Sequence, residues 1–286
     1  RHKLKTMKNY LELKSLSAIL DSYDIFFIDL WGVIHNGVSV FDNVVPVLEN
    51  LKKANKMVFF ITNAPRRAFV IAEQLEQFGV RADLYQKIVS SGELTWHKIK
   101  EKYQKKNCFI IGPPRDHHLI EGLDVKIVNK DSDVDIILNT GPWGDNDCLD
   151  NYTDLLNHLV KKGSSMICSN PDKTVVRGEE FWICAGLLAE YYEKIGGEVE
   201  YYGKPFKQIY EFCFNFFDKK NKKILVIGDS LENDIKGANN LKIDSLLITD
   251  GIHREVNINN SVDKQKLDGL IESKNIFPDF YMRKLT

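Results

Sequence analysis

The sequence predicts an α/β protein built on a doubly wound parallel sheet, into which a second α/β block is inserted. Short, nearly continuous apolar runs are typical of strands buried on both faces of a parallel sheet. These runs alternate with segments whose apolar residues have helical spacing. Polar residues follow several of the runs directly, where open α/β sheets place their ligands. The length of 286 residues agrees with about two domains.

The first part of the chain supplies three strands and three helices to the predicted sheet. Apolar residues at helical spacing predict the helix Val44–Asn55, and Pro65 is suited to the first turn of the next helix. The elements expected here are the strand Ile25–Asp29, the helix Val44–Asn55, the strand Met57–Thr62, a helix from Pro65 to Phe78, the strand Ile88–Ser91 and a helix from about Glu93 to Tyr103.

A second block with its own strand and helix pattern begins near Lys105, so we expect an inserted domain over residues 106–198. The ranges 1–105 and 199–286 would then form one core. Inside the insertion we expect strands Cys108–Gly112, Ile136–Asn139 and Met166–Ser169, with helices Cys148–Lys161 and Phe181–Ile195. After it we expect the strand Tyr201–Gly203, the helix Phe206–Phe217, the strand Lys223–Ile227, the helix Asp234–Leu241, the strand Ser245–Ile248 and a polar tail, Asn257–Ser273, with a late helix.

Composition excludes several classes of function. The 39 basic and 40 acidic residues nearly balance, so nothing indicates a nucleic-acid or membrane-surface partner. Five scattered cysteines form no Cys-x-x-Cys pair, which favours a cytoplasmic location and argues against a zinc site or a disulfide framework. No apolar run is long enough to span a bilayer. The basic N-terminal segment has no apolar core behind it, so we expect no secretion signal.

Four predicted strand ends carry residues suited to phosphoryl chemistry. A parallel sheet gathers such ends at one edge, so positions distant in sequence can form one pocket. A carboxylate can act as a nucleophile or ligate a hard cation, and a Lys can neutralise charge that develops on a phosphoryl group. The groups are Asp29, then Thr62-Asn63, then Lys204 after Gly203, then Gly228-Asp229-Ser230 with Asn233-Asp234.

These segments closely resemble the four motifs of the haloacid dehalogenase-like (HAD) hydrolase superfamily, in the same order. The long insertion between the second and third motifs resembles the NagD-like class IIA branch, in which an α/β cap stands at that place. Asn170-Pro171-Asp172 and Tyr202-Gly203-Lys204-Pro205 also match that branch. The resemblance extends from about Tyr23 to Gly251 and implies a Rossmann-like core with an inserted cap.

The resemblance implies a role for each matching residue. Asp29 would be the nucleophile that forms an aspartyl-phosphate, and Lys204 would hold both Asp29 and the phosphate. Thr62 and Asn63 would bind the phosphoryl oxygens. Mg²⁺ would be bound by Asp29, Asp229 and the main-chain carbonyl of Trp31, with Asp234 supporting it through water. In the cap, Asn170, Asp172 and Arg177 are candidates for substrate contact.

Trp31 departs from the family pattern. Phosphatases of the superfamily have a second Asp two residues after the nucleophile, where it protonates the leaving alcohol and later activates water. An indole ring cannot do this work near neutral pH, and such assistance is typically worth about 10²–10⁴-fold. His35 is the nearest titratable residue in sequence, although a turn near Asn36-Gly37 also accounts for it.

We therefore expect a cytoplasmic, Mg²⁺-dependent hydrolase that acts on a small phosphorylated metabolite and could form a homodimer. Two alternatives remain. One is a phosphate-binding or regulatory protein on the same fold, with catalysis weakened or lost through Trp31. The other is a non-phosphate hydrolase that uses the same Asp nucleophile. The sequence does not identify the substrate, because specificity resides in cap residues that follow no readable code.

Overall fold

The computed structural model describes residues 9–177 and 180–286, and it divides into two compact units. One unit comprises the chain up to Ile61 together with Gln74–Ile88 and Phe216–Thr286. The other comprises Thr62–Glu73 and Val89–Asn215. The boundaries predicted above for core and cap stay a prediction.

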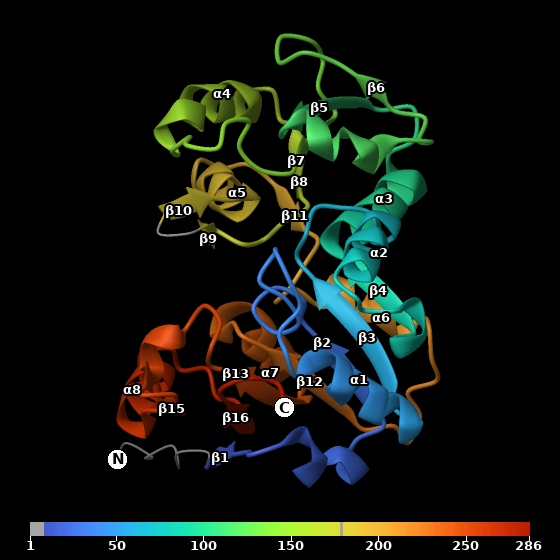
Figure 1. The fold of residues 1–286 in the computed structure, drawn as a ribbon. Coiled ribbons are helices and arrows are strands. Elements are labelled where there is room, and N and C mark those ends of the chain that lie inside the picture. Colours follow the sequence, from blue (N-terminus) through green and yellow to red (C-terminus); the bar gives the residue numbers. More distant parts are fainter. Residues whose placement is uncertain (1–8, 178–179) are drawn as a thin grey trace, which may run out of the picture. The chain divides into compact units, whose positions relative to one another are not determined.

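The first unit is organised by a seven-stranded sheet with the order β1-β16-β13-β12-β2-β3-β4 (Figure 1). The pairings from β1 through β3 are parallel. All four residues of β2 are buried, as expected for a strand in the middle of a doubly wound sheet. The strands are β1 Leu11–Glu12, β2 Ile25–Ile28, β3 Met57–Thr62, β4 Lys87–Ser90, β12 Ile224–Gly228, β13 Asp244–Ile248 and β16 Phe280–Met282.

The order of the strands places a topological switch point at β2. From β2 the chain continues to β3 on one side, whereas β12 joins β2 from the other side much later in the sequence. In open α/β sheets, ligands bind beyond the carboxyl ends of the strands at such a point. The predicted α/β class with a doubly wound parallel sheet is confirmed, and the end of β2 is where this topology favours a ligand site.

The second unit contains a separate parallel sheet of five strands with the order β11-β8-β7-β5-β6. Helices α4 and α5 pack on each other, and α5 also contacts β7, β8 and β11. Their core includes the fully buried side chains of Tyr152, Leu156, Leu188 and Tyr192. The strands are β5 Asn107–Ile111, β6 Lys126–Ile127, β7 Ile136–Asn139, β8 Ser165–Cys168 and β11 Val199–Tyr201.

The helices follow the predicted apolar spacing. In α1 the buried residues are Val44, Val47, Leu48 and Leu51, which form one stripe along the helix. A short π-helical turn, Leu231–Ile235, precedes α7. Ser230 is its N-cap, and the Oγ of Ser230 accepts a hydrogen bond from Asn233 N at 3.2 Å. The α-helices are α1 Val44–Lys53, α2 Ala68–Gln77, α3 Ser91–Lys102, α4 Asp150–Lys161, α5 Ala185–Lys194, α6 Lys207–Phe214, α7 Lys236–Leu241 and α8 Lys264–Lys274.

Two local predictions were wrong or incomplete. The predicted helix Phe181–Ile195 begins as a strand, because Glu180–Ile183 (β10) pairs antiparallel with Thr174–Arg177 (β9), and only Ala185–Lys194 is helical. The tail contains the small hairpin of β14 (Asn257–Ile258) and β15 (Ser261–Val262), and then α8 and β16.

Among the described residues, no helix combines the length and apolar character needed to cross a membrane.

Candidate active site

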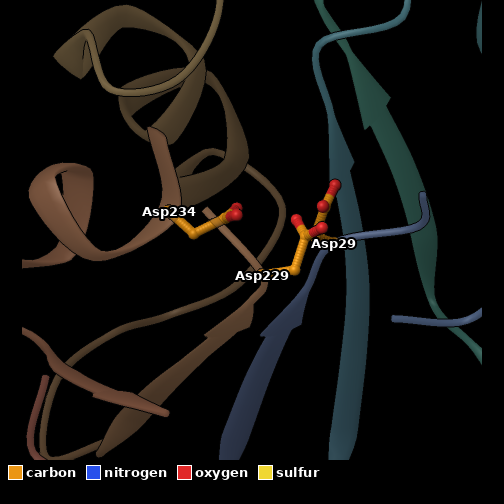
Figure 2. Close-up of side chains that lie close together, drawn as sticks. All are labelled: Asp29, Asp229 and Asp234. Atoms are coloured by element: carbon orange, nitrogen blue, oxygen red, sulfur yellow. The ribbon is translucent and has the colours of Figure 1, made fainter. Parts of the chain in front are cut away.

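Three carboxylates meet at the carboxyl ends of β2 and β12. Oxygen atoms of Asp29, Asp229 and Asp234 all lie within 4.8 Å of one another. Figure 2 shows the side chains of Asp29 and Asp229 next to each other and that of Asp234 directed toward the same space. Within the described ranges, no other group of three or more His, Cys, Asp and Glu side chains is placed to hold a metal ion together. The structure therefore brings together three of the residues expected from the sequence.

Main-chain hydrogen bonds position the backbone of Asp29 and the carboxylates of Asp229 and Asp234. Asp29 directly follows β2, and its N–H donates to the carbonyl of Ile227 at 2.9 Å, which extends the pairing of β2 with β12. Asp229 directly follows β12, and its Oδ2 accepts from Ile252 N at 2.9 Å. Asp234 Oδ2 accepts from Ser230 N at 3.1 Å. The carboxylates of Asp229 and Asp234 are thus oriented by the main chain, as a precise binding site requires.

Two glycines leave the space that Asp229 occupies. A Cβ atom on Gly32 would lie 2.3 Å from Asp229 Oδ2, and a Cβ on Gly251 would lie 2.2 Å from the same oxygen. Both distances are impossible for real atoms, so the main chain can approach this carboxylate only where it lacks a side chain. Sequence reasoning missed the segment around Gly251, which has no distinctive signal beyond a glycine after the apolar strand β13.

The residues of this cluster fit a hard divalent cation. Asp29, Asp229 and Asp234 are 9%, 7% and 1% exposed. Burial of several adjacent anions is unfavourable unless positive charge compensates them. The side chains offer only oxygen ligands, which Mg²⁺ and Ca²⁺ prefer. The expected ligation by the Trp31 carbonyl stays a prediction.

Trp31 and His35 belong to a small flap after Asp29, residues 31–40, in which isolated bridges pair Trp31 with His35 and His35 with Val40. The indole ring of Trp31 lies over Gly37, since a Cβ atom on Gly37 would come within 2.1 Å of the ring. His35 is buried, and its Nδ1 accepts a hydrogen bond from Gly37 N at 2.9 Å. Burial lowers the pKa of His35 to about 4, so the imidazole is neutral near pH 7. His35 is therefore a poor replacement for the missing acid.

A second polar group lies inside the other unit. It joins Asn63 to Asp172, 109 residues later in the chain, and to Lys204, 141 residues later. The amide of Asn63 donates to Asp172 Oδ1 at 2.8 Å and to the Lys204 carbonyl at 3.0 Å. Its oxygen accepts from Lys204 N at 2.7 Å. Three residues predicted separately as phosphate-binding or cap residues are thus directly connected.

The remaining predicted residues of this unit are near that group or on the β9–β10 hairpin. Thr62 is the last residue of β3, and its Oγ1 accepts from Ala64 N at 3.2 Å. Asn170 Oδ1 accepts from Asp172 N at 3.1 Å. Arg177 ends β9, and its side chain lies outside the described part of the structure. The roles assigned to these residues stay predictions.

The loop after β13 contains a further residue that the sequence did not single out. His253 is buried, and its Nε2 accepts from Leu231 N at 3.2 Å. Burial lowers the pKa of His253, which favours the neutral ring that this hydrogen bond needs. The bond joins the loop that holds Asp229 to the turn that carries Asp234, so His253 supports the geometry of the carboxylate cluster.

Comparison with known proteins agrees with this fold and shows the family. Models of two related families match the chain, the haloacid dehalogenase-like hydrolases over residues 26–126 and a HAD-hydrolase-like family over residues 201–273. A haloacid dehalogenase-like hydrolase from Brucella suis is 31% identical, with a TM-score of 0.81 over 96% of this chain and 100% of that one. The chain belongs to the haloacid dehalogenase-like hydrolase superfamily. Within it, the similarities fall in the NagD-like branch.

Two more distant relatives have named activities. A 4-nitrophenylphosphatase from Schizosaccharomyces pombe is 22% identical over 99% of this chain and 97% of its own length. A glycerol phosphate phosphatase from Mycobacterium tuberculosis, solved in complex with magnesium, is 19% identical. Its TM-score is 0.70, over 93% of this chain and 77% of that one.

Proposed function

We propose that this chain is a phosphatase that hydrolyses small phosphorylated metabolites through an aspartyl-phosphate on Asp29. The observation that carries the proposal is the cluster of Asp29, Asp229 and Asp234 at the switch point of the parallel sheet. The family membership and the phosphatase names of several relatives support it.

In the proposed reaction, a carboxylate oxygen of Asp29 attacks phosphorus and forms a new P–O bond. The bond from phosphorus to the leaving-group oxygen breaks, and that oxygen departs with the electron pair. Water then attacks phosphorus, gives up a proton to solvent or to a base, and releases inorganic phosphate with the Asp29 carboxylate restored. Neither Trp31 nor neutral His35 supplies a proton to the leaving group. We therefore expect leaving groups of low pKa, such as p-nitrophenolate, to be favoured.

We propose Mg²⁺ as the metal, held by Asp29, Asp229 and the Trp31 carbonyl with support from Asp234. When bound, the ion supplies positive charge that reduces repulsion between Asp29 and an anionic phosphate. Calorimetric titration tests this assignment. Wild type should bind Mg²⁺, and Asp229→Ala should bind it far more weakly. Equal binding by the two proteins would reject the site.

Thr62 and Lys204 keep the roles toward the phosphoryl group that the family resemblance implies, and Asn170 and Arg177 stay candidates for substrate contact. The resemblance also implies phosphate binding by Asn63 and substrate contact by Asp172, but the hydrogen bonds of Asn63 to Asp172 and to the Lys204 main chain favour a positioning role for both residues. None of these roles is needed for the nucleophile assignment, so each is tested separately. The expectations of a cytoplasmic location and a homodimer rest on the sequence and the resemblance alone.

Trp31 favours one alternative, a phosphate-binding protein in which catalysis has been lost. A panel of aryl, sugar and nucleotide phosphates, assayed for phosphate release with and without Mg²⁺, separates the two functions. Release that requires Mg²⁺ and disappears in Asp29→Asn supports the phosphatase. Binding of inorganic phosphate without turnover of any substrate supports the alternative. Turnover of a substrate that has no phosphate would indicate the non-phosphate hydrolase.

A further inference from the structure

The side-chain amide of Asn63 makes two hydrogen bonds to the main chain of Lys204. Lys204 N donates to Asn63 Oδ1 at 2.7 Å, and Asn63 Nδ2 donates to the Lys204 carbonyl at 3.0 Å. Asn63 is only 6% exposed and Lys204 only 3%. Water therefore cannot easily replace these bonds, and the two contacts fix both the position and the orientation of the main chain from which the Lys204 side chain departs.

Asp172 and the main chain of Lys204 together determine which way the Asn63 amide faces. Asn63 Nδ2 has two acceptors, Asp172 Oδ1 at 2.8 Å and the Lys204 carbonyl, whereas Asn63 Oδ1 faces the N–H of Lys204. Turning the amide over would oppose oxygen to oxygen and nitrogen to nitrogen, so a single orientation satisfies all three bonds. An amide nitrogen carries two hydrogens, and both are used here. The side chain therefore has no hydrogen left to donate to a phosphate oxygen.

The segments on either side of this contact are packed closely. Asp172 N donates to Asn170 Oδ1 at 3.1 Å, and the Asp172 carbonyl accepts from Gly186 N at 2.9 Å. A Cβ atom on Gly203 would lie 2.4 Å from Pro171 Cδ, so the residue before Lys204 rests directly on the loop that carries Asp172. Asp172 is thus held in the position from which it orients Asn63.

We propose that Asn63 is a positioning residue for Lys204, that Asp172 orients it, and that its side chain is not itself a phosphate ligand. The inference rests on the proposed function in one respect, because it takes Lys204 to contact the phosphoryl group. It assigns Asn63 and Asp172 a joint role that differs from phosphate binding and from substrate contact. Loss of the amide should leave Lys204 itself chemically intact but loosen the main chain that positions its side chain.

A matched control is available elsewhere in the chain. Asn239 Nδ2 donates to the Phe277 carbonyl at 3.0 Å, and Phe277 N donates to Asn239 Oδ1 at 3.3 Å. Asn239→Ala therefore removes the same pair of bonds from a main-chain segment that has no part in the proposed chemistry. Any effect that comes only from a general loss of stability should appear in both alanine variants.

The first measurement does not depend on activity. Hydrogen exchange followed by NMR or by mass spectrometry of short peptides reports protection of the Lys204 amide, whose N–H donates to Asn63 Oδ1. Asn63→Ala should accelerate exchange at Lys204, and Asn239→Ala should accelerate it at Phe277 but not at Lys204. Unchanged exchange at Lys204 in Asn63→Ala would overturn the proposal.

The second measurement is the steady-state turnover of p-nitrophenyl phosphate. Misplacement of a catalytic group by about 1 Å can cost on the order of 10²-fold. We therefore expect kcat to fall at least about tenfold in Asn63→Ala, with less change in KM, and to stay near wild type in Asn239→Ala. An equal fall of kcat in both variants would show a purely structural role.

Exchanging the amide and the carboxylate between positions 63 and 172 tests whether the lost kcat can be restored. Asn63→Asp keeps the acceptor for Lys204 N but loses both donors and sets two carboxylates against each other. Adding Asp172→Asn restores a donor–acceptor pair between positions 63 and 172 with the direction reversed, so part of the lost kcat should return. Absence of any recovery would contradict the orienting role of Asp172. If wild type turns over no phosphate ester, the proposed function fails, and hydrogen exchange alone still decides the contact between Asn63 and Lys204.

Discussion

The ring of His35 meets the indole of Trp31 edge to face, with ring centroids 5.5 Å apart and planes inclined at 84°. The centroid of the His35 ring also lies 5.2 Å from that of Phe78. A protonated imidazole in this place would lose most of its hydration, and burial is the cause of the lowered pKa of His35. The flap in which Trp31 stands at the position of the usual acid therefore contains a buried histidine that is neutral near pH 7.

This geometry predicts an acid-sensitive flap. Burial lowers the folded-state pKa of His35 to about 4 from 6.5. The unfolded chain therefore binds this proton more readily, and the stability contributed by His35 is complete above pH 6.5 and declines as the pH falls toward 4. The shift corresponds to about 3 kcal/mol in the free energy of unfolding. Denaturant unfolding at pH 7.5 and pH 4.5 measures the decline.

His35→Asn is the control for this measurement. Its side-chain oxygen can still accept from Gly37 N but has no proton to gain in this range. The variant should be less stable than wild type at pH 7.5, because it loses the ring contacts, and the difference should shrink at pH 4.5. Two parallel stability profiles would mean that His35 does not titrate as described.

The close approach of Gly32 to Asp229 predicts loss of metal binding without loss of the fold. Gly32→Ala would place a Cβ atom 2.3 Å from Asp229 Oδ2, so this carboxylate must move. Gly32 also has a φ of +82°, which strains any other residue. Gly79→Ala is a matched control, because Gly79 has a φ of +89° and open space around it.

Backbone strain should cost each alanine variant about 1 kcal/mol or somewhat more. Gly32→Ala should lose further stability because Asp229 must also be displaced. Only Gly32→Ala should weaken binding of Mg²⁺ in calorimetric titration, and we expect the loss to reach at least about tenfold. Tight Mg²⁺ binding by Gly32→Ala would show that Asp229 is not a ligand in its present position.

The nucleophile assignment predicts that Asp29→Asn is folded and inactive. The amide has nearly the shape of the carboxylate but cannot attack phosphorus productively. Turnover of p-nitrophenyl phosphate should fall to background, while circular dichroism and the melting temperature stay close to those of wild type. Mass spectrometry of acid-quenched wild type should find phosphate on the peptide that contains Asp29. Undiminished turnover by the variant would refute the mechanism.

The carboxylate cluster could be predicted from sequence because it depends on local signals. Asp29 and Asp229 each follow an apolar run, and parallel strands carry such ends to one edge. The contact between Asn63 and Lys204 could not be predicted, since nothing local indicates a partner 141 residues away.

Some short strands were not predicted from the sequence for a related reason. Strands β1 and β16 have two and three residues, and their pairing joins Leu11 to Phe280 from opposite ends of the chain. Strand β10 was mistaken for helix because Phe181, Trp182 and Ile183 run without a break toward the apolar residues of α5. Only the partner strand β9 decides their conformation.

Because Trp31 stands where the usual acid would be, we expect turnover to depend steeply on the pKa of the leaving group. No acid is supplied at position 31, so a p-nitrophenolate should depart far faster than a sugar alkoxide, which needs a proton. The same position normally supplies the base for the second step, so aspartyl-phosphate should accumulate and give a burst of alcohol release. Rates for a series of aryl and alkyl phosphates, plotted against leaving-group pKa, measure the dependence.

Two variants decide whether Trp31 is the cause. Trp31→Ala removes the ring without adding an acid, and Trp31→Asp adds the carboxylate that other members of the superfamily carry. The indole is 45% exposed, so its removal should cost well below the ~3–5 kcal/mol of a fully buried Trp, and both variants should fold. If the missing acid limits the rate, Trp31→Asp should hydrolyse alkyl phosphates about tenfold or more faster than Trp31→Ala. If wild type already hydrolyses alkyl and aryl phosphates equally fast and without a burst, another residue supplies the proton. Since His35 is neutral and its Nδ1 is occupied, that residue should then be sought outside the flap.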